Sequence, residues 1–269
     1  MLAGRGRPDL AALLRQNRTW QSLHGEAEIH TFTRQDLSED ATFYRPAHSE
    51  LPKARRGLLV GMTARGGRLT MPIAGFLQAL PSHQWDVLIL RDRWRLHYRH
   101  GVHGLADTFT DLVHAVANLA SAYRQTVALG TSMGGLPAIR LGRLAGLTRA
   151  VSIAGRPWDD VQRIGAQGAA VPAFDPLCAC ARPSSCAQWF VSAANHGKDL
   201  AMARRHAELW HGRVLALPAL QTHHVLGEAW LSGQLPALLD LLLATTRQDA
   251  SDPLERGADA PREVSAERS

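Results

Sequence analysis

Short apolar runs alternate with helix-like segments through most of this 269-residue chain, and that alternation restricts the fold more than any other feature. The runs at 57–62, 86–90 and 126–129 are almost wholly apolar, which is typical of strands buried on both faces of a sheet. Between the last two runs, residues 109–123 carry apolar side chains at helical spacing. Strands that alternate with helices indicate an α/β fold, a mostly parallel sheet with helices on both faces.

The same patterns predict the remaining elements of the sheet and its covering helices. Further strands are predicted over 25–32, 41–44, 150–153, 189–193 and 213–217, and further helices over 71–80, 135–144, 200–210 and 233–243. The strand at 41–44 is expected to pair antiparallel with the one at 25–32. We therefore expect a sheet of about eight strands.

Three segments lie outside this alternation. Residues 1–24 mix leucines with basic residues, which predicts a short helix laid over a main domain at 25–246. Residues 155–187 contain repeated glycines and prolines and are too long for a simple connection, so we expect a lid there. Residues 247–269 are polar and mixed in charge, which is typical of a disordered tail.

The charged residues argue against a nucleic-acid partner. The formal net charge is +6, but Lys53 and Lys198 are the only lysines, and the arginines are spread along the chain without a basic stripe interleaved with aromatic residues. No window approaches the run of about 20 apolar residues that a membrane span needs. We expect neither a nucleic-acid partner nor a membrane span, and the sequence does not predict an oligomeric state.

The cysteines bear on the cellular compartment and on cofactors. Cys178, Cys180 and Cys186 lie close together and are odd in number, which is not a disulfide framework. Their spacing lacks the second half of a zinc site, so we expect them to pack as small apolar residues, and we expect no metal or organic cofactor. The first residues lack the unbroken apolar stretch of a secretory signal. These features predict a cytoplasmic protein with reduced thiols.

The sharpest local signal is the sequence Gly-Thr-Ser-Met-Gly-Gly at 130–135, which follows a predicted strand and precedes a predicted helix. So tight a turn strains the backbone of the serine and leaves room only for small neighbours, which Gly130 and Gly134 provide. The turn lifts the hydroxyl of Ser132 clear of the sheet, and the following helix points its amides at developing negative charge. The pattern indicates that Ser132 is a nucleophile. A glycine-rich turn that contains a serine by chance is the competing interpretation.

This elbow, the strands before it and a late histidine resemble the α/β-hydrolase superfamily over about residues 50–245, and the elbow is the motif-specific part. The resemblance implies an α/β-hydrolase fold with a lid insertion and a catalytic triad in the chain order nucleophile, acid, histidine. It implies a serine hydrolase that cleaves an ester, thioester or related acyl bond of a small molecule through an acyl-serine intermediate. The alternatives are an acyltransferase with the same triad, and a hydrolase fold without catalysis that serves as a binding protein.

In that order the histidine follows the last strand, where His223 and His224 are adjacent. We favour His223 because it comes first after the turn. A neutral imidazole there would take the proton of Ser132, which is otherwise a poor nucleophile. Two loop histidines without a catalytic role are the competing interpretation.

The acid is expected after the penultimate strand, where Asp199 is the only carboxylate of its loop. A carboxylate at this place would fix the tautomer of the imidazole and stabilise the imidazolium. Asp199 also precedes a predicted helix, so a role as helix N-cap is open. Asp159 and Asp160, after the preceding strand, are alternative acids, and Asp175 lies deeper in the expected lid.

The oxyanion of the reaction needs two amide donors. The amide of Met133, next to the nucleophile, is expected to be one of them. The resemblance places the second donor in the turn after the strand at 57–62, with Thr63 as first choice and Met62 as second.

Arginines crowd the two loops that should border the pocket. Arg65 and Arg68 follow one strand, and Arg91 follows the next. Ligands of open parallel sheets bind at the carboxyl ends of the strands, and guanidinium groups pair with carboxylate or phosphate. We therefore hypothesise that these three residues bind an anionic acyl substrate. A solvated basic surface, partly paired with Asp86 and Asp92, is the alternative.

Overall fold

The computed structural model describes residues 29–81, 84–156 and 185–244. The helix predicted over 1–24, nearly all of the lid predicted over 155–187 and the tail predicted over 247–269 lie outside the described residues. These three assignments therefore stay predictions.

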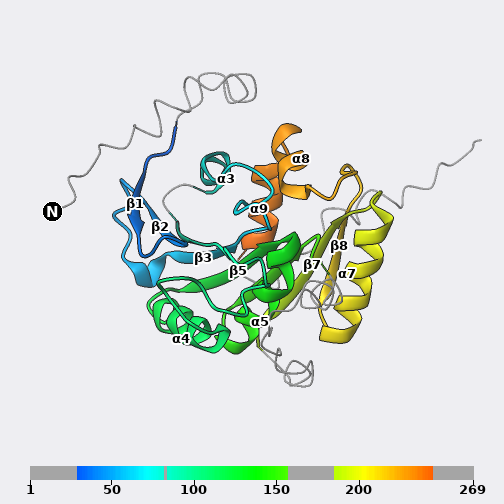
Figure 1. Ribbon diagram of the computed structural model, residues 1–269. Coiled ribbons are helices and arrows are strands. Elements are labelled where there is room, and N and C mark those ends of the chain that lie inside the picture. Colours follow the sequence, from blue (N-terminus) through cyan, green and yellow to red (C-terminus); the bar gives the residue numbers. More distant parts are fainter. Residues whose placement is uncertain (1–28, 82–83, 157–184, 245–269) are drawn as a thin grey trace, which may run out of the picture.

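An eight-stranded sheet runs through the described residues in the order β1-β2-β4-β3-β5-β6-β7-β8 (Figure 1). The strands are β1 (Phe32–Asp36), β2 (Ala41–Pro46), β3 (Gly57–Met62), β4 (Trp85–Leu90), β5 (Gln125–Thr131), β6 (Arg149–Ile153), β7 (Ala187–Ala193) and β8 (Arg213–Leu217). From β4 to β8 all neighbours are parallel, whereas β1 and β2 form an antiparallel hairpin and β2 is antiparallel to β4. The predicted mostly parallel sheet is confirmed.

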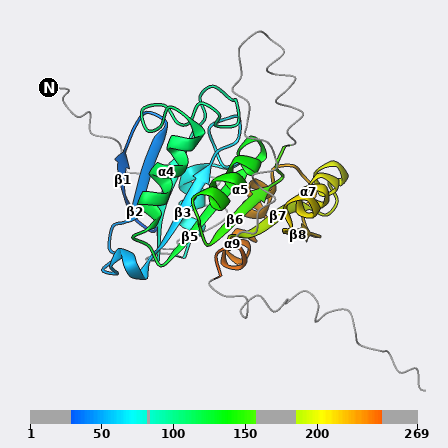
Figure 2. The ribbon, with the colours of Figure 1, turned by 90° about the horizontal axis from the view of Figure 1, so that it is seen from below.

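Helices cover both faces of the sheet (Figures 1 and 2). One face carries α4 (Phe109–Ala120), α5 (Gly135–Leu144) and α7 (Gly197–Trp210). The other carries α3 (Ile73–Ala79), α8 (Val225–Leu231) and α9 (Leu235–Leu243). Each face buries its own hydrophobic cluster, so β3, β4 and β5 are buried along their whole length. Burial on both faces explains why these strands are apolar without alternation.

The strands at the centre of the sheet end level with one another. Gly57–Met62 pairs in register with Trp85–Leu90 on one side and with residues 125–130 on the other. The loops after β3, β4 and β5 therefore leave the same edge of the sheet together. This edge is where ligands of open parallel sheets bind.

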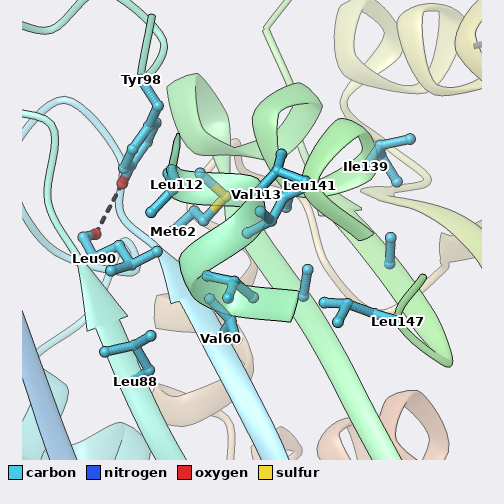
Figure 3. Close-up of a cluster of buried hydrophobic side chains, with 14 of the residues drawn as sticks. Val60, Met62, Leu88, Leu90, Tyr98, Leu112, Val113, Ile139, Leu141 and Leu147 are labelled. Carbon is cyan, nitrogen blue, oxygen red and sulfur yellow. Dashed lines mark hydrogen bonds between the residues drawn. The ribbon is translucent and has the colours of Figure 1, made fainter. Parts of the chain in front are cut away.

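A buried tyrosine fixes the loop after β4 to that edge (Figure 3). The Tyr98 hydroxyl donates to the carbonyl of Leu90 at 2.8 Å and lies 3.3 Å from the hydroxyl of Thr63. Burial raises the pKa of Tyr98, so the hydroxyl stays a neutral donor. The side chain of Tyr98 packs in the cluster that also contains Met62 and Leu112.

Two element boundaries differ from the predictions for local reasons. Strand β1 begins at Phe32, where the prediction over 25–32 ends, because the turn closed by the amide of Leu37 on the carbonyl of Ala41 pairs the residues nearest to it. Helix α4 ends at Ala120 and not at 123, because the Tyr123 hydroxyl is drawn to the buried carboxylate of Asp86, 2.6 Å away. Within the described ranges, none of the helices is long and apolar enough to cross a membrane.

Candidate active site

Ser132 stands on a strained turn between β5 and α5. It opens a short 3-10 helix, Ser132–Gly134, and its φ of 51° lies in the left-handed region that side chains avoid. A Cβ at Gly130 would collide with the carbonyl oxygen of Gly134, and one at Gly134 would collide with the carbonyl oxygen of Met62. The two glycines therefore make the strained turn possible, as the sequence pattern predicts.

A chain of two hydrogen bonds joins three residues that are distant in sequence. Ser132 Oγ lies 2.9 Å from Nε2 of His223, and His223 Nδ1 lies 2.7 Å from Oδ2 of Asp199. An ionised carboxylate only accepts hydrogen bonds, so Nδ1 carries the proton and Nε2 is left to accept from the serine hydroxyl. The carboxylate side chain is only 9% exposed and the imidazole 16%. The arrangement can transfer the serine proton to the imidazole and stabilise the cation that results.

The alternatives for these positions are resolved in part. Asp199 is not the N-cap of α7, because that helix begins at Gly197 with His196 at the cap position. Instead Asp199 lies in the first turn, where the positive end of the helix dipole favours its negative charge. His224 is the exposed residue before α8, and His223 is the one that contacts Ser132.

The three alternative acids, Asp159, Asp160 and Asp175, lie outside the described residues.

The loop that presents His223 is held by a residue that sequence reasoning missed. The carboxylate of Glu228, in α8, accepts hydrogen bonds from the amides of Gln221 at 3.0 Å and Thr222 at 2.8 Å, and from the Thr222 hydroxyl at 2.9 Å. The same hydroxyl accepts from the amide of His224 at 3.2 Å. Burial acts to raise the pKa of Glu228, but the bonds from Thr222 and Gln221 outweigh it and lower the pKa below its ordinary value.

A second histidine, His196, also escaped prediction. Its Nδ1 lies 3.0 Å from Oδ2 of Asp199, the oxygen that His223 binds. No pattern in the sequence pairs Glu228 with its loop, whereas His196 precedes Asp199 by three residues at the start of α7, so its contact with the carboxylate is a local one.

The two expected oxyanion donors differ in their surroundings. Met133 is buried in the first turn after the strand, where helical amides have no partner within the helix. The amide of Thr63 donates to the carbonyl of Leu90 at 3.1 Å and so extends the pairing of β3 with β4 by one residue. The second choice, Met62, lies within β3 and is paired on both sides. The backbone amide of Met133 is thus placed where it could donate to an oxyanion, whereas the amide of Thr63 is bound to the carbonyl of Leu90.

Of the three expected substrate-binding arginines, one has a contact that draws it toward another strand. Arg65 and Arg68 are exposed in the turn after β3. Arg91 donates from Nη1 to the hydroxyl of Thr42 on β2 at 3.0 Å. Strand β2 is three places from β5 in the sheet, roughly 14 Å at the usual strand spacing, so this contact turns Arg91 away from the nucleophile.

The aspartates proposed as partners for these arginines have other contacts. The buried carboxylate of Asp86 binds Arg56 at 2.7 Å, and that of Asp92 accepts from the amide of Tyr98 at 2.9 Å. In the loop after β4, Arg93 pairs with Glu39 at 2.5 Å. Arg65 and Arg68, the two cations after β3, are exposed.

Among the described residues, no cluster of three or more histidine, cysteine, aspartate or glutamate side chains is placed to hold a metal ion. Cys186 is buried in the core, and burial raises the pKa of its thiol to about 12, so it packs as a protonated, small apolar residue. Cys178 and Cys180 lie outside the described residues.

Comparison with known proteins gives matches among solved structures alone, since neither a family model nor a curated protein matches the chain. The ester-hydrolase EH1AB1 from the metagenome of Lake Arreo matches with 14% identity and a TM-score of 0.53, covering 87% of this chain and 90% of that chain. Est1E from Butyrivibrio proteoclasticus has 11% identity and a TM-score of 0.48, covering 77% of this chain and 98% of that chain. With the sheet order and the strained serine after β5, the likeness to EH1AB1 shows that this chain has the α/β-hydrolase fold.

Proposed function

We propose that this protein is a serine hydrolase that cleaves a carboxylic ester, a thioester or a related acyl bond of a small molecule. The observation that carries the proposal is the hydrogen-bonded chain from Ser132 through His223 to Asp199. It combines a nucleophile, a base in hydrogen-bond reach of it, and a buried carboxylate that orients the base. The strained backbone at Ser132 adds support, because such strain concentrates at functional sites.

In the first half of the reaction, Ser132 Oγ attacks the acyl carbon while its proton passes to Nε2 of His223. Asp199 stabilises the imidazolium, and the amide of Met133 donates to the oxyanion. The imidazolium then gives its proton to the departing alcohol or thiol, which leaves an ester between the acyl group and Ser132. We assign Thr63 no donor role while its amide is bound to Leu90.

In the second half, a water molecule replaces the leaving group. His223 takes a proton from the water, the hydroxide attacks the acyl carbon, and Ser132 recovers its proton as the acid departs. An acyltransferase would admit an alcohol or amine in place of water at this step.

The substrate class and the location are further parts of this proposal. The exposed cations Arg65 and Arg68 follow β3 at the edge of the sheet that carries Ser132, so we retain an anionic group on the substrate as a proposal. The cysteine pattern supports a cytoplasmic location.

The proposal is tested by labelling with a fluorophosphonate probe and by turnover of activated esters of increasing acyl length. Ser132→Ala should abolish labelling and reduce turnover by several orders of magnitude, and Asp199→Asn and His223→Ala should reduce turnover on a similar scale. His224→Ala is the matched control, since it removes the adjacent imidazole, and should be mild. Full turnover in Ser132→Ala would contradict the proposal, and a wild-type protein that neither labels nor turns over would favour a binding protein.

A further inference from the structure

The chain segment directly after β6 is hydrogen-bonded to the nucleophile turn. Ala154 follows the last residue of β6, and its amide donates to the carbonyl of Val191 on β7 at 2.8 Å. The backbone of Ala154 then turns with a φ of 47°, in the left-handed region that side chains avoid. Two residues later, the amide of Arg156 donates to the carbonyl oxygen of Ser132 at 3.0 Å. We call the three residues Ala154, Gly155 and Arg156 the strap.

The carbonyl of Ser132 and the amide N–H of Met133 belong to one peptide group. A peptide group is planar, and in its trans form the C=O and N–H bonds point in opposite directions. The Ser132 carbonyl accepts hydrogen bonds from the amide of Gly135, within the turn, and from the amide of Arg156, on the strap. Hydrogen bonds that fix the direction of this carbonyl therefore also fix the direction in which the N–H of Met133 points.

We propose that the strap is a positioning element, which aims the amide of Met133 at the oxyanion by holding the other end of the same peptide group. The inference rests on the proposed function, in which Met133 donates to the oxyanion. Arg156 acts through its backbone N–H and has no contact with the substrate in this role. A donor that is aimed in advance stabilises the oxyanion without reorganisation at the moment of reaction.

Close packing beneath the strap supports this role. Gly155 lies between Ser152, on β6, and Gly135, the first residue of α5. A Cβ at Gly155 would collide with Oγ of Ser152, whereas its next nearest atoms would be 3.6 Å and 3.7 Å away, at ordinary van der Waals distances. Gly155 does not adopt a positive φ, so a side chain is excluded there by lack of space and not by the backbone conformation. The absence of a side chain lets the strap approach Ser132.

Two further observations bear on the strap. Ser152 Oγ is buried and has no hydrogen-bond partner within the described ranges, so the atom that limits the space at Gly155 can be removed without loss of a hydrogen bond. The left-handed backbone of Ala154 is strained for a residue with a side chain, and such conformations persist only where the surroundings enforce them. The strap is thus held in one position by its anchor on β7 and by its contact with the turn.

A set of substitutions separates the position of the strap from general damage to the fold. Gly155→Ala places a Cβ against Ser152 Oγ and should move the strap away from the Ser132 carbonyl. Combining Gly155→Ala with Ser152→Ala removes the collision, so the strap should return. Gly135→Ala is the matched comparison, because its Cβ would meet Ser152 Oγ at 2.5 Å and also Cα of Gly155 at 2.7 Å. Ser152→Ala should therefore not rescue Gly135→Ala.

The experiment measures kcat and KM for a neutral activated ester and the inhibition constant of a trifluoromethyl ketone. Ser132 Oγ adds to the carbonyl carbon of the ketone, the serine proton passes to His223, and the carbonyl oxygen becomes an oxyanion, so the affinity of the ketone reports oxyanion stabilisation. We expect Gly155→Ala to lower kcat about tenfold or more with KM within about twofold, and to weaken binding of the ketone by a similar factor. Ser152→Ala, alone or combined with Gly155→Ala, should stay within about twofold of the wild type.

A wild-type kcat in Gly155→Ala would overturn the inference, as would a loss that Ser152→Ala does not restore or a change in KM alone. If Gly155→Ala does not fold, an α-hydroxy acid in place of Arg156 tests the same hydrogen bond, because it replaces the amide N–H by an ester oxygen. It should lower kcat about threefold to tenfold, and an unchanged kcat would overturn the inference. The proposed function fails on a different result, which is retained activity in Ser132→Ala.

Discussion

Glu228→Ala tests whether the loop before α8 must be held for His223 to act. The substitution removes a carboxylate that accepts from two amides and one hydroxyl immediately before His223. It leaves the three residues of the hydrogen-bonded chain intact. We expect kcat to fall with little change in KM, because the loop would be aligned for proton transfer in a smaller fraction of molecules.

The magnitude follows from the number of bonds lost. Hydrogen bonds to charged groups contribute about 1.5–3 kcal/mol each when sheltered, but Glu228 is partly exposed, so we take somewhat under 1 kcal/mol for each of the three. Their sum, about 2 kcal/mol, corresponds to a factor of roughly 30 in the population of the aligned loop. Glu228→Gln keeps one acceptor oxygen and should lie between the wild type and Glu228→Ala.

Steady-state kinetics on an activated ester and the rate of fluorophosphonate labelling of Ser132 measure the effect. Both should fall by about tenfold to thirtyfold in Glu228→Ala, at a temperature at which circular dichroism shows the protein folded. Glu208→Ala, which removes an exposed glutamate on α7, is the control. If kcat stays within twofold of the wild type, or if KM alone rises, the loop does not need this brace.

Three further predictions concern the elbow, a buried acid and the surface cations. Gly134→Ala should lower the free energy of unfolding, measured by chemical denaturation, by about 2 kcal/mol, because the new Cβ would collide with backbone oxygens. Gly66→Ala, where the new Cβ would meet open space, should change it by less than about 0.5 kcal/mol. Burial raises the pKa of Asp92 by more than its backbone hydrogen bonds lower it, so the folded protein binds this proton more tightly than the unfolded chain does. Relative to Asp92→Asn, the free energy of unfolding of the wild type should therefore fall as the pH rises from the ordinary aspartate pKa through the raised one. Parallel plots of unfolding free energy against pH for the two proteins would contradict this. If the substrate is anionic, Arg68→Ala should raise the KM for that substrate about tenfold in a salt-dependent manner. Arg91→Ala should not raise it, because the guanidinium of Arg91 is bound to Thr42.

The parts of the fold that could be predicted are those whose pattern comes from burial. Strand β3 and helix α5 have the predicted bounds, since a strand covered on both faces must be apolar throughout and a helix over a sheet must repeat its apolar side. Helix α8, Val225–Leu231, was not predicted. Its apolar residues pack through tertiary contacts that no local pattern records.

In the site, Ser132 could be predicted because the tight turn itself requires the glycines on either side of the serine, and these are visible in the sequence. Asp199 and His223 came from the order of elements along the chain, and the structure brings both to the serine. Glu228 could not be predicted, because it acts on a loop that the sequence alone does not place beside it. His196 was not predicted either, although it lies only three residues before the carboxylate that it contacts. The hydrogen bond of the Thr63 amide could not be predicted for the same reason as the contact of Glu228, since its partner belongs to the neighbouring strand.

The sheet order explains why the acid follows β7. Strands β7 and β8 are neighbours, with Ala193 opposite Leu217, so the loops that carry Asp199 and His223 leave the sheet side by side. The loop after β6 leaves the sheet one strand further away, roughly 10 Å from β8, whereas the loop after β7 leaves it roughly 5 Å from β8.

The same geometry sets a demand on the histidine loop. Strand β8 lies three places from β5, roughly 14 Å, yet the imidazole of His223 comes within 2.9 Å of the hydroxyl of Ser132. The loop must therefore reach back across the ends of β7 and β6, and a segment extended in this way is costly to order unless its backbone is held. Glu228 holds its last residues, and the side chain of Asn195 donates to the carbonyl of Pro218 at its start, 3.2 Å away. The distance that the histidine must cover is thus the physical reason for bracing both ends of the loop.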